Sequence, residues 1–424
     1  MKNFLKSFIV FLLAFLARVV VRRYRPSIVM ISGSVGKTST KDAVAAVLSA
    51  RFLVRSSDKS FNSEFGVPFT ILNVENPWGN PYAWFLVVKN ALALLLLPNH
   101  YPNMLVLEVG ADRPGDIARI LRIATPDVVV ITRLPEIPVH VEAYTSPEAV
   151  HEEEFSPAYA LNATAPLIIP DDDPYVLICT KRTPARRISY GMTDGASVRI
   201  TDVDFYEVAG KVAGMQANVS IKGGQWSLVV KGSVGKTQLL PCAAALATAL
   251  AFEVSLPEAL KALEKYKPPP GRGQLLSGKN NSIIIDDSYN ASPAAVEEAL
   301  ATLKISPRAK RRIAVLGDML ELGRYSVMEH KRIGALARDS ADLVVAVGIR
   351  ARAFASVSGN AEVMLFDNSQ VAAEALSDLV HADDVILVKG SQSIRTERIV
   401  EALLADPSDT SRLVRQEKEW KRKM

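Results

Sequence analysis

The sequence of 424 residues contains little cysteine, and the positions of its cysteines exclude several kinds of protein. Cys179 and Cys242 are far apart, and neither has a partner at the spacing of a metal site. A disulfide framework and a zinc site are therefore not expected, and a reducing cytosol is the natural setting.

A strong excess of charge of one sign is also absent. Lysines and arginines number 50 against 45 aspartates and glutamates, which gives a formal net charge of +5. This mild excess fits anionic ligands or an anionic membrane surface. The basic residues are scattered and no DNA- or RNA-binding motif occurs, so we expect no nucleic-acid partner. A hydrophobic content of 49% indicates a globular chain, long enough for two or three domains.

Long hydrophobic runs are missing except at the N-terminus. Residues 4–21 are interrupted only by Lys6, Ser7 and Arg18, and an arginine-rich segment follows. As a helix this stretch would be roughly 27 Å long, slightly less than the ~30 Å hydrocarbon core of a bilayer. We expect it to attach the chain to the inner, cytoplasmic face of the cell membrane. The sequence leaves three arrangements open: a single span, an interfacial anchor, or a helix packed on the protein itself.

Beyond Pro26 the pattern is that of an α/β protein. Short apolar runs alternate with longer helical segments, which is typical of a mostly parallel sheet with helices on both faces. Residues 190–232 differ, because their short alternating runs favour an antiparallel insertion. The stiff segment "KPPPGRG" (267–273) favours a domain boundary. A second α/β pattern follows it without the glycine fingerprint of dinucleotide-binding proteins.

The strongest motif is a phosphate-binding loop between a strand and a helix, "VMISGSVGKTST" (29–40). Its two glycines allow a tight turn that brings backbone N–H groups close to an anion. Its lysine can reach the β- and γ-phosphates of a nucleotide, and the next threonine can bind magnesium. Ile31 stands where the general pattern has its first glycine. The residues expected to contact the nucleotide are Gly33, Ser34, Gly36, Lys37, Thr38 and Ser39.

Similar letters recur as "GSVGKTQ" (232–238), again between a strand and a helix. Composition alone would predict a second phosphate site around Lys236 and Thr237. We expect none there, because the surrounding sequence resembles an antiparallel insertion.

Eight motifs in the same order make the chain similar to the Mur ligases over roughly residues 27–400. They are "GSVGKTST" (33–40), "FNSEFGVP" (61–68), "LEVGADRPGDI" (107–117), "HVEAY" (140–144), "PGRG" (270–273), "DDSYNASP" (286–293), "LGDMLELG" (316–323) and "VKGSQSIRTE" (388–397). The sixth and seventh motifs resemble the branch of the family that adds a dipeptide.

The resemblance implies the domain organisation. A central ATP-binding domain in residues 26–268 would follow a hydrophobic helix in residues 1–25. A Rossmann-like ligase domain in residues 269–405 and a charged tail in residues 406–424 would complete the chain. The tail is expected either to be a solvated end or to contact anionic lipid.

The resemblance also implies the roles of individual residues. It makes Lys37, His140 and Glu154 the expected catalytic residues, with ATP and Mg²⁺ as cofactors. Thr38, Glu108 and His140 match metal-site positions. The residues that resemble the ATP-facing surface of the C-terminal domain are Arg272, Asp287, Tyr289 and Asn290. The residues expected near the substrates are Asn62, Glu64, Lys389, Ser391 and Arg395.

Three departures from the family pattern affect these expectations. The family normally begins with a domain that holds a uridine nucleotide, whereas here the phosphate loop starts at Gly33. A lysine that relatives carbamylate is replaced by Glu154, or by Glu153 if the register slips, and a glutamate supplies the negative charge without modification. Near the adenine, the sequence has Thr237, Gln238 and Cys242 where relatives more often have histidine and asparagine.

The expected activity is that of an ATP-dependent amide ligase of cell-wall precursor synthesis. It would activate the carboxylate of a small or lipid-linked muramoyl-peptide-like substrate as an acyl phosphate. The amine would come from an amino acid or a dipeptide, most simply D-alanyl-D-alanine. The alternatives are a poly-γ-glutamate or capsule ligase, and a membrane-tethered nucleotide-binding protein with little catalysis.

Overall fold

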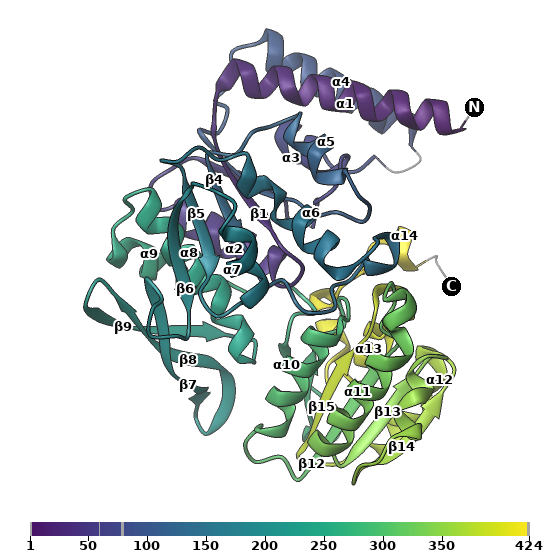
Figure 1. Cartoon of the computed structure of the whole chain (residues 1–424). Coiled ribbons are helices and arrows are strands. Elements are labelled where there is room, and N and C mark those ends of the chain that lie inside the picture. The colour runs from purple at the N-terminus through teal and green to yellow at the C-terminus, as the bar shows by residue number, and fades with distance from the viewer. Residues whose placement is uncertain (1, 59, 78–79, 422–424) are drawn as a thin grey trace.

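The computed structural model describes residues 2–58, 60–77 and 80–421, and it contains two sheets with helices packed against them (Figure 1). Most strand pairs in both sheets are parallel, so the expected α/β class is confirmed.

The first sheet has nine strands in the order β2-β3-β1-β4-β5-β6-β7-β8-β9. The neighbours from β2 to β7 are parallel, whereas β7, β8 and β9 pair antiparallel, as the alternating runs predicted. Its strands are β1 (Ser27–Ser32), β2 (Val54–Ser56), β3 (Met104–Glu108), β4 (Val128–Ile131), β5 (Pro166–Pro170), β6 (Arg186–Gly191), β7 (Val198–Val208), β8 (Lys211–Ile221) and β9 (Gly224–Lys231). Since β3 and β4 lie on opposite sides of β1, the carboxyl end of β1 is a point where ligands bind in open α/β sheets.

Helices cover both faces of this sheet because its central strands are apolar on both sides. Val29 and Ile31 of β1 belong to a core with α2, α8 and α9, whereas Ile28 and Met30 belong to a core with α1 and α3–α7. These helices are α1 (Lys2–Tyr24), α2 (Lys37–Leu48), α3 (Gly66–Leu72), α4 (Pro81–Leu96), α5 (Asp116–Leu121), α6 (Pro147–Tyr159), α7 (Pro174–Thr180), α8 (Leu240–Ala251) and α9 (Leu256–Leu263).

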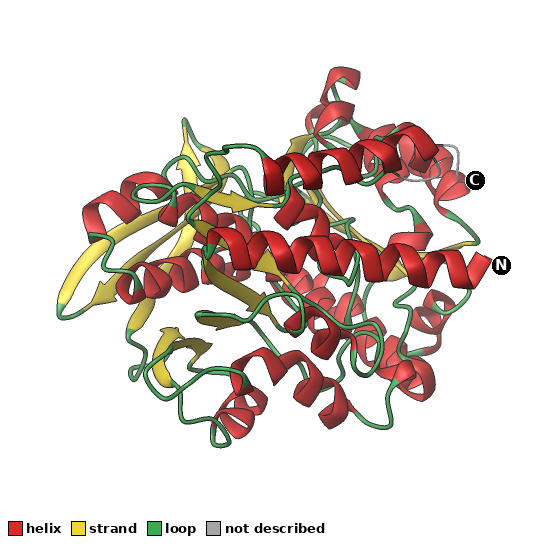
Figure 2. Cartoon of the chain, turned by 90° about the horizontal axis from the view of Figure 1, so that it is seen from above, coloured by secondary structure: helices red, strands yellow, loops and turns green. Residues whose placement is uncertain are grey.

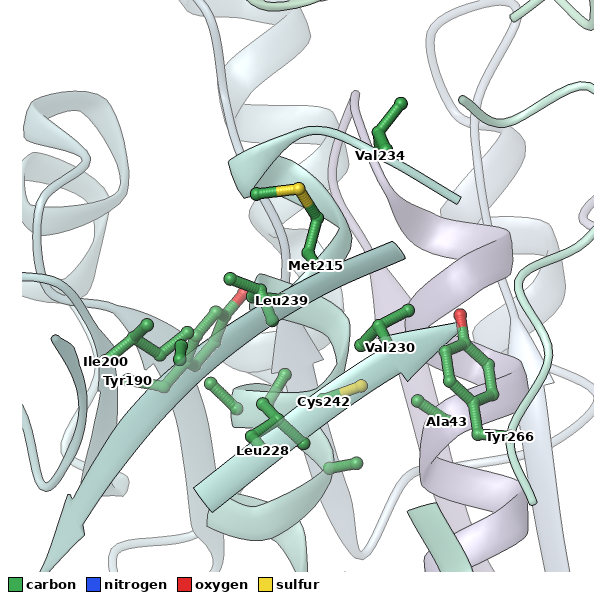
Figure 3. Close-up of a cluster of buried hydrophobic side chains, with 14 of the residues drawn as sticks. Ala43, Tyr190, Ile200, Met215, Leu228, Val230, Val234, Leu239, Cys242 and Tyr266 are labelled. Atoms are coloured by element: carbon green, nitrogen blue, oxygen red, sulfur yellow. The ribbon is translucent and has the colours of Figure 1, made fainter. Parts of the chain in front are cut away.

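Part of the α2–α8 core is shown in Figure 3. Ala43 of α2 and Cys242 of α8 are fully buried there, and Met215 of β8 belongs to the same cluster. The Tyr266 hydroxyl donates a hydrogen bond to the Ser39 carbonyl at 3.1 Å. This core therefore fixes the position of the helix that follows the phosphate loop.

The second sheet has six strands in the order β10-β11-β15-β12-β13-β14. Only β10 and β11 pair antiparallel. The strands are β10 (Gln274–Ser277), β11 (Ile283–Asp286), β12 (Arg311–Gly317), β13 (Leu343–Val347), β14 (Glu362–Phe366) and β15 (Asp384–Lys389). The helices are α10 (Pro293–Lys304), α11 (Ser326–Ser340), α12 (Ser369–Leu379), α13 (Glu397–Leu403) and α14 (Lys418–Lys421). Short 3₁₀ helices are η1 (Val141–Ala143), η2 (Lys236–Gln238), η3 (Lys279–Asn281), η4 (Gly323–Tyr325), η5 (Ala351–Ser356), η6 (Gln392–Ile394) and η7 (Pro407–Arg412).

The hydrophobic N-terminal segment forms α1, which packs on α3 and α4 at the edge of the molecule (Figures 1 and 2). Leu13, Ala17 and Val20 are buried in the core shared with those helices. The Tyr24 ring stacks on that of Tyr101 with centroids 4.4 Å apart. Within the described residues, no helix combines the length and the apolar character that crossing a bilayer requires. One side of α1 is packed on the protein, whereas Phe11 and Phe15 on its other side are exposed.

Among the described residues of the charged C-terminal tail, Lys418–Lys421 forms the short helix α14. Arg415 is buried, and its guanidinium lies 2.9 Å from the Glu397 carboxylate. The segment around Arg415 therefore packs against α13 beside the second sheet, which differs from the expected solvated tail.

Candidate active site

The predicted phosphate loop connects the end of β1 to the start of α2. Gly33 and Gly36 have φ angles of +118° and +90°, in a region that side chains disfavour. A Cβ atom on Gly33 would lie 2.4 Å from the Thr132 hydroxyl oxygen. No side chain of the described residues caps α2, so the first N–H groups of the helix can bind an anion.

Lys37 folds back over this loop. Its ammonium donates a hydrogen bond to the Gly33 carbonyl and lies 3.6 Å from a carboxylate oxygen of Glu154. The Gly33 N–H donates to the other oxygen of Glu154 at 3.1 Å. The lysine is therefore held at the loop by neutralising contacts that a phosphate could replace.

Glu154 lies on α6 and is only 2% exposed. Burial raises the pKa of Glu154, although the nearby Lys37 ammonium and the Gly33 N–H favour its charged form. Glu153 points elsewhere, because it accepts the N–H groups of Gly115 and Ile117 at 3.0 Å each. The structure thus places Glu154, and not its neighbour, beside the loop.

Glu108 ends β3, whose register pairs Ile31 of β1 with Glu108. One of its carboxylate oxygens accepts hydrogen bonds from Thr38 at 3.2 Å and from Ser60 at 2.5 Å. The other oxygen is buried and has no hydrogen-bond partner among the described residues. A buried carboxylate oxygen without a partner, beside a phosphate loop, is suited to a cation.

A protein-only metal cage is absent from the described part of the chain, since no three His, Cys, Asp or Glu side chains gather closely enough. Magnesium does not require such a cage, because it is usually held by one or two carboxylates together with substrate phosphates and water. Thr38 and Glu108 provide a donor set of that kind.

His140 lies opposite the loop, with a left-handed φ of 67°. Its Nδ1 is 3.0 Å from Glu321, which belongs to the second half of the chain, the part that contains the second sheet. Its Nε2 is 3.5 Å from Asp112 of the first half. Burial disfavours the charged imidazole, but the hydrogen bond to Glu321 and the charges of both carboxylates raise the pKa of His140. The same hydrogen bond lowers the pKa of Glu321.

The second half of the chain supplies the opposite wall. The Arg272 guanidinium lies 4.0 Å from the centre of the Tyr289 ring. Lys389 is buried against Asp287 at 2.6 Å and also donates to the Asn290 carbonyl at 2.9 Å. Burial lowers the pKa of Lys389, although Asp287 favours its charged form.

Thirteen of the residues singled out in the sequence line one cleft of about 700 Å³ between the two halves. They are Ser34, Gly36, Lys37, Thr38, Asn62, Glu108, His140, Glu154, Arg272, Tyr289, Asn290, Ser391 and Arg395. Ser39, Asp287 and Lys389 line a narrow hollow next to it. Glu64 lines neither, and its carboxylate lies 3.0 Å from Arg119.

A second cleft, of about 760 Å³, lies on the other side of the loop. Its walls include Pro174, Tyr175 and Glu297. Gly36 lines both clefts and the narrow hollow. A ligand that has its phosphates on the loop can therefore reach into both clefts at once.

The second "GSVGKTQ" segment has a different structural setting. It follows β9, an edge strand of the antiparallel part, and leads through η2 into α8. Lys236 lies 3.4 Å from Glu298, and Thr237 lines the second cleft. Cys242 is fully buried, and burial raises the pKa of its thiol to about 12.

Sequence reasoning assigned no role to eight residues that line the cleft. Among them are Ser60, Asp112, Glu321 and Trp420. Asp112 and Glu321 belong to motifs that were recognised, so their acidic character was a usable signal. Trp420 gave no signal, because its place depends on the returning C-terminal segment.

Comparison with protein families gives two matches. Residues 31–249 match the Mur ligase middle domain, and residues 271–392 match the glutamate ligase domain of the Mur ligases.

Individual proteins agree with these matches. The UDP-N-acetylmuramoyl-tripeptide–D-alanyl-D-alanine ligase of Mycobacterium leprae (strain TN) is 30% identical, over 90% of this chain and 74% of its own length. The ligase of the same name from Bacillus subtilis (strain 168) is 26% identical, over 92% of this chain and 79% of its own. The crystal structure of MurF ligase from Thermotoga maritima in complex with ADP has a TM-score of 0.74 and 25% identity, covering 93% of this chain and 83% of that one.

Proposed function

Because this chain belongs to the Mur ligase family, we propose that it is an ATP-dependent ligase joining a muramoyl-peptide carboxylate to the amino group of D-alanyl-D-alanine. One observation carries the proposal. The phosphate loop, Glu108 and His140 from the first half and Arg272 and Ser391 from the second half line the same cleft. A cleft shared by two halves can hold ATP and two further substrates together.

The geometry supports a defined position for ATP. With its phosphates on the loop, the base would lie in the second cleft and the γ-phosphate in the cleft that contains Glu108. The Lys37 ammonium would exchange the Gly33 carbonyl for phosphate oxygens. N–H groups at the start of α2 would bind the same anion.

Two bond exchanges follow from this arrangement. A substrate carboxylate oxygen attacks the γ-phosphorus, the bond to the bridging oxygen of ADP breaks, and an acyl phosphate forms. The amine nitrogen then attacks the acyl carbon, inorganic phosphate leaves with the electron pair, and the nitrogen loses a proton to form the amide. The walls supplied by both halves keep water from the acyl phosphate.

Magnesium fits the donors around the loop. When bound, it neutralises phosphate charge during the transfer. The Thr38 hydroxyl and the free oxygen of Glu108 would hold it, and His140 would join after its contact with Glu321 opens. Glu154 would supply the fixed negative charge that a carbamylated lysine supplies in relatives.

We assign each of the two remaining substrates to one wall of the cleft. We place the muramoyl-peptide, in free or lipid-linked form, near Asn62 on the first half. We place the dipeptide near Ser391 and Arg395 on the second half. Because both ATP and these precursors are found in the cytosol, the reaction would take place there.

Product analysis tests the proposal. The purified chain is given ATP, magnesium, D-alanyl-D-alanine and muramoyl-tripeptides with and without UDP, and the products are identified by mass spectrometry. We expect ADP, phosphate and a pentapeptide in equal amounts. Turnover with glutamate but not with the dipeptide would favour a capsule-type ligase. ATP binding without phosphate release on any carboxylate would contradict the ligase assignment.

A further inference from the structure

The exposed apolar side chains of α1 and α4 form one stripe on each helix. On α1, Phe11 and Phe15 are one turn apart and are 69% and 52% exposed. On α4, exposed residues recur at steps of three and four, with Lys89 at the third place of the stripe. We call the following six exposed side chains the α1–α4 face: Phe11, Phe15, Tyr82, Phe85, Leu92 and Leu96.

The opposite stripes of both helices are buried in one core. Leu13 and Val20 of α1 pack there, together with Val87, Ala91 and Leu94 of α4. The exposed stripes therefore lie on the sides of α1 and α4 that are turned away from this core, and the two helices run side by side along one edge of the molecule (Figure 1). Helices that are apolar on every side normally have both sides buried, and here the fold buries only one.

The two helices that form this face carry charge of a single sign. Neither α1 nor α4 contains an aspartate or glutamate. Arg22, Arg23 and Arg25 are exposed where α1 ends, and Lys89 is exposed within the stripe of α4. The acidic residue nearest to α4 in the sequence is Glu75, which lies before the helix, and the nearest to α1 is Asp42 in α2. An occupant of this face must therefore be apolar inside and anionic at its rim.

We propose that the α1–α4 face lies flat on an anionic lipid bilayer. The exposed aromatic and leucine side chains would enter the boundary between headgroups and acyl chains, and the arginines would contact the headgroups. A second copy of the chain fits less well, because it would bring another basic face opposite this one without any acidic partner. This inference does not depend on the ligase function.

The face is connected to the cleft by a row of aromatic rings. Trp84 of α4 lies 6.1 Å from Phe69 of α3, and Phe69 lies 6.1 Å from Phe61. Phe61 directly precedes Asn62, which lines the cleft. The segment that carries Asn62 is therefore linked through these rings to the helices of the α1–α4 face.

Vesicle flotation of the full chain tests the proposal. With vesicles of phosphatidylcholine and phosphatidylglycerol we expect most of the protein to float, and with phosphatidylcholine alone much less. Raising the salt concentration should weaken binding, because headgroup attraction is screened. A chain that stays unbound to the anionic vesicles at low salt overturns the proposal.

Substitutions on the α1–α4 face test whether this face is responsible for vesicle binding. The double substitution Phe11→Ser and Phe85→Ser should lower the bound fraction by about tenfold. The matched control, Val208→Ser with Val327→Ser, removes two exposed apolar side chains elsewhere and should bind like the parent chain. If the double variant unfolds, Arg22→Glu with Lys89→Glu should still abolish the preference for anionic vesicles. Equal binding by either face variant and the control contradicts the proposal.

Light scattering without lipid tests whether the α1–α4 face instead binds a second copy of the chain. We expect a monomer at all concentrations. A dimer that the Phe11→Ser and Phe85→Ser substitutions dissociate would show that this face binds a second copy, and would overturn the lipid assignment.

Discussion

At the scale of single residues, Glu154 stands out, because a buried acid touches both the lysine and the backbone of the phosphate loop. A carboxylate there stabilises Lys37 at rest and sets the charge that the nucleotide meets. Glu154→Gln keeps the shape and removes the charge. We expect turnover to fall about 100-fold and magnesium affinity to weaken.

The neighbouring residue provides the control for this prediction. Glu153→Gln alters contacts to α5 and leaves the loop intact, so it should affect stability more than turnover. Steady-state phosphate release at varied magnesium concentration measures both variants. Full turnover in Glu154→Gln would remove the assigned role.

Two lysines in nearly identical sequence settings provide a second test. Lys37→Ala removes the ammonium at the loop, and we expect at least a ~100-fold loss of phosphate release. Lys236→Ala removes the ammonium of the repeated segment, which pairs with Glu298, and should change the rate less than about threefold. Titration with a fluorescent ATP analogue compares nucleotide binding in the two variants. Equal losses would mean that the repeated segment also binds phosphate.

Asp286 predicts a dependence of stability on pH. It is fully buried, and burial raises its pKa to about 6. One of its oxygens accepts the Ser288 N–H at 3.1 Å, and the other has no partner among the described residues. The carboxyl group of Asp286 therefore binds its proton more tightly in the folded chain than in the unfolded chain. The stability that the protonated carboxyl contributes at low pH is lost as pH rises from about 4 to 6.

Asp286→Asn should abolish this loss. Relative to the variant, the parent chain should lose up to about 3 kcal/mol of unfolding free energy between about pH 4 and pH 7. Urea unfolding at both pH values gives the difference, and the exposed Asp194→Asn should leave it unchanged. Parallel pH profiles for Asp286→Asn and the parent would contradict the prediction.

Single residues also show what the sequence could predict of the site. Lys37, Thr38 and Glu108 were predictable, because short motifs next to apolar strands fix their places. The contact between His140 and Glu321 was not predictable from the sequence, because Glu321 comes from the other half of the chain. Such pairs depend on how two sheets are placed, and local pattern carries no information on that.

At the scale of elements, periodicity predicted the strands that are buried on both faces and the antiparallel hairpins. It missed β5, which begins and ends with proline, a residue that normally argues against strands. For the charged C-terminal tail, nothing in the sequence indicated that one of its arginines, Arg415, is buried. The many charges of this segment suggested that it is exposed to solvent. Its Arg415 is instead buried because it forms an ion pair with Glu397.

The loop between β1 and α2 gives a prediction at this scale. Gly33→Ala would force a Cβ atom into Thr132 and strain the backbone, so the loop must move. We expect nucleotide affinity to fall by at least about tenfold. Gly223→Ala is the control, because it has a similar positive φ of +80° and no atom within 4 Å. The control substitution should lower the stability of the chain without changing its affinity for the nucleotide. Isothermal titration with ADP measures the affinity of both variants. A normal affinity in Gly33→Ala would show that the loop tolerates the change.

At the scale of the whole molecule, the cleft depends on contacts between the two halves. Arg133 lies 3.0 Å from Glu298, and His140 lies 3.0 Å from Glu321. Each pair joins one half to the other, and a nucleotide that engages His140 must rearrange one of them. The division near residue 268 stays a prediction, and β10, the first strand of the second sheet, begins at Gln274.

Glu154 has a further consequence for the conditions in which the chain works. A carbamylated lysine forms only while dissolved carbon dioxide is present, and it reverts when the gas is removed. A glutamate has its carboxylate in the side chain itself and needs no modification. We therefore expect the ligase to keep its full rate in degassed, bicarbonate-free buffer, where a carbamate-dependent relative would slow down.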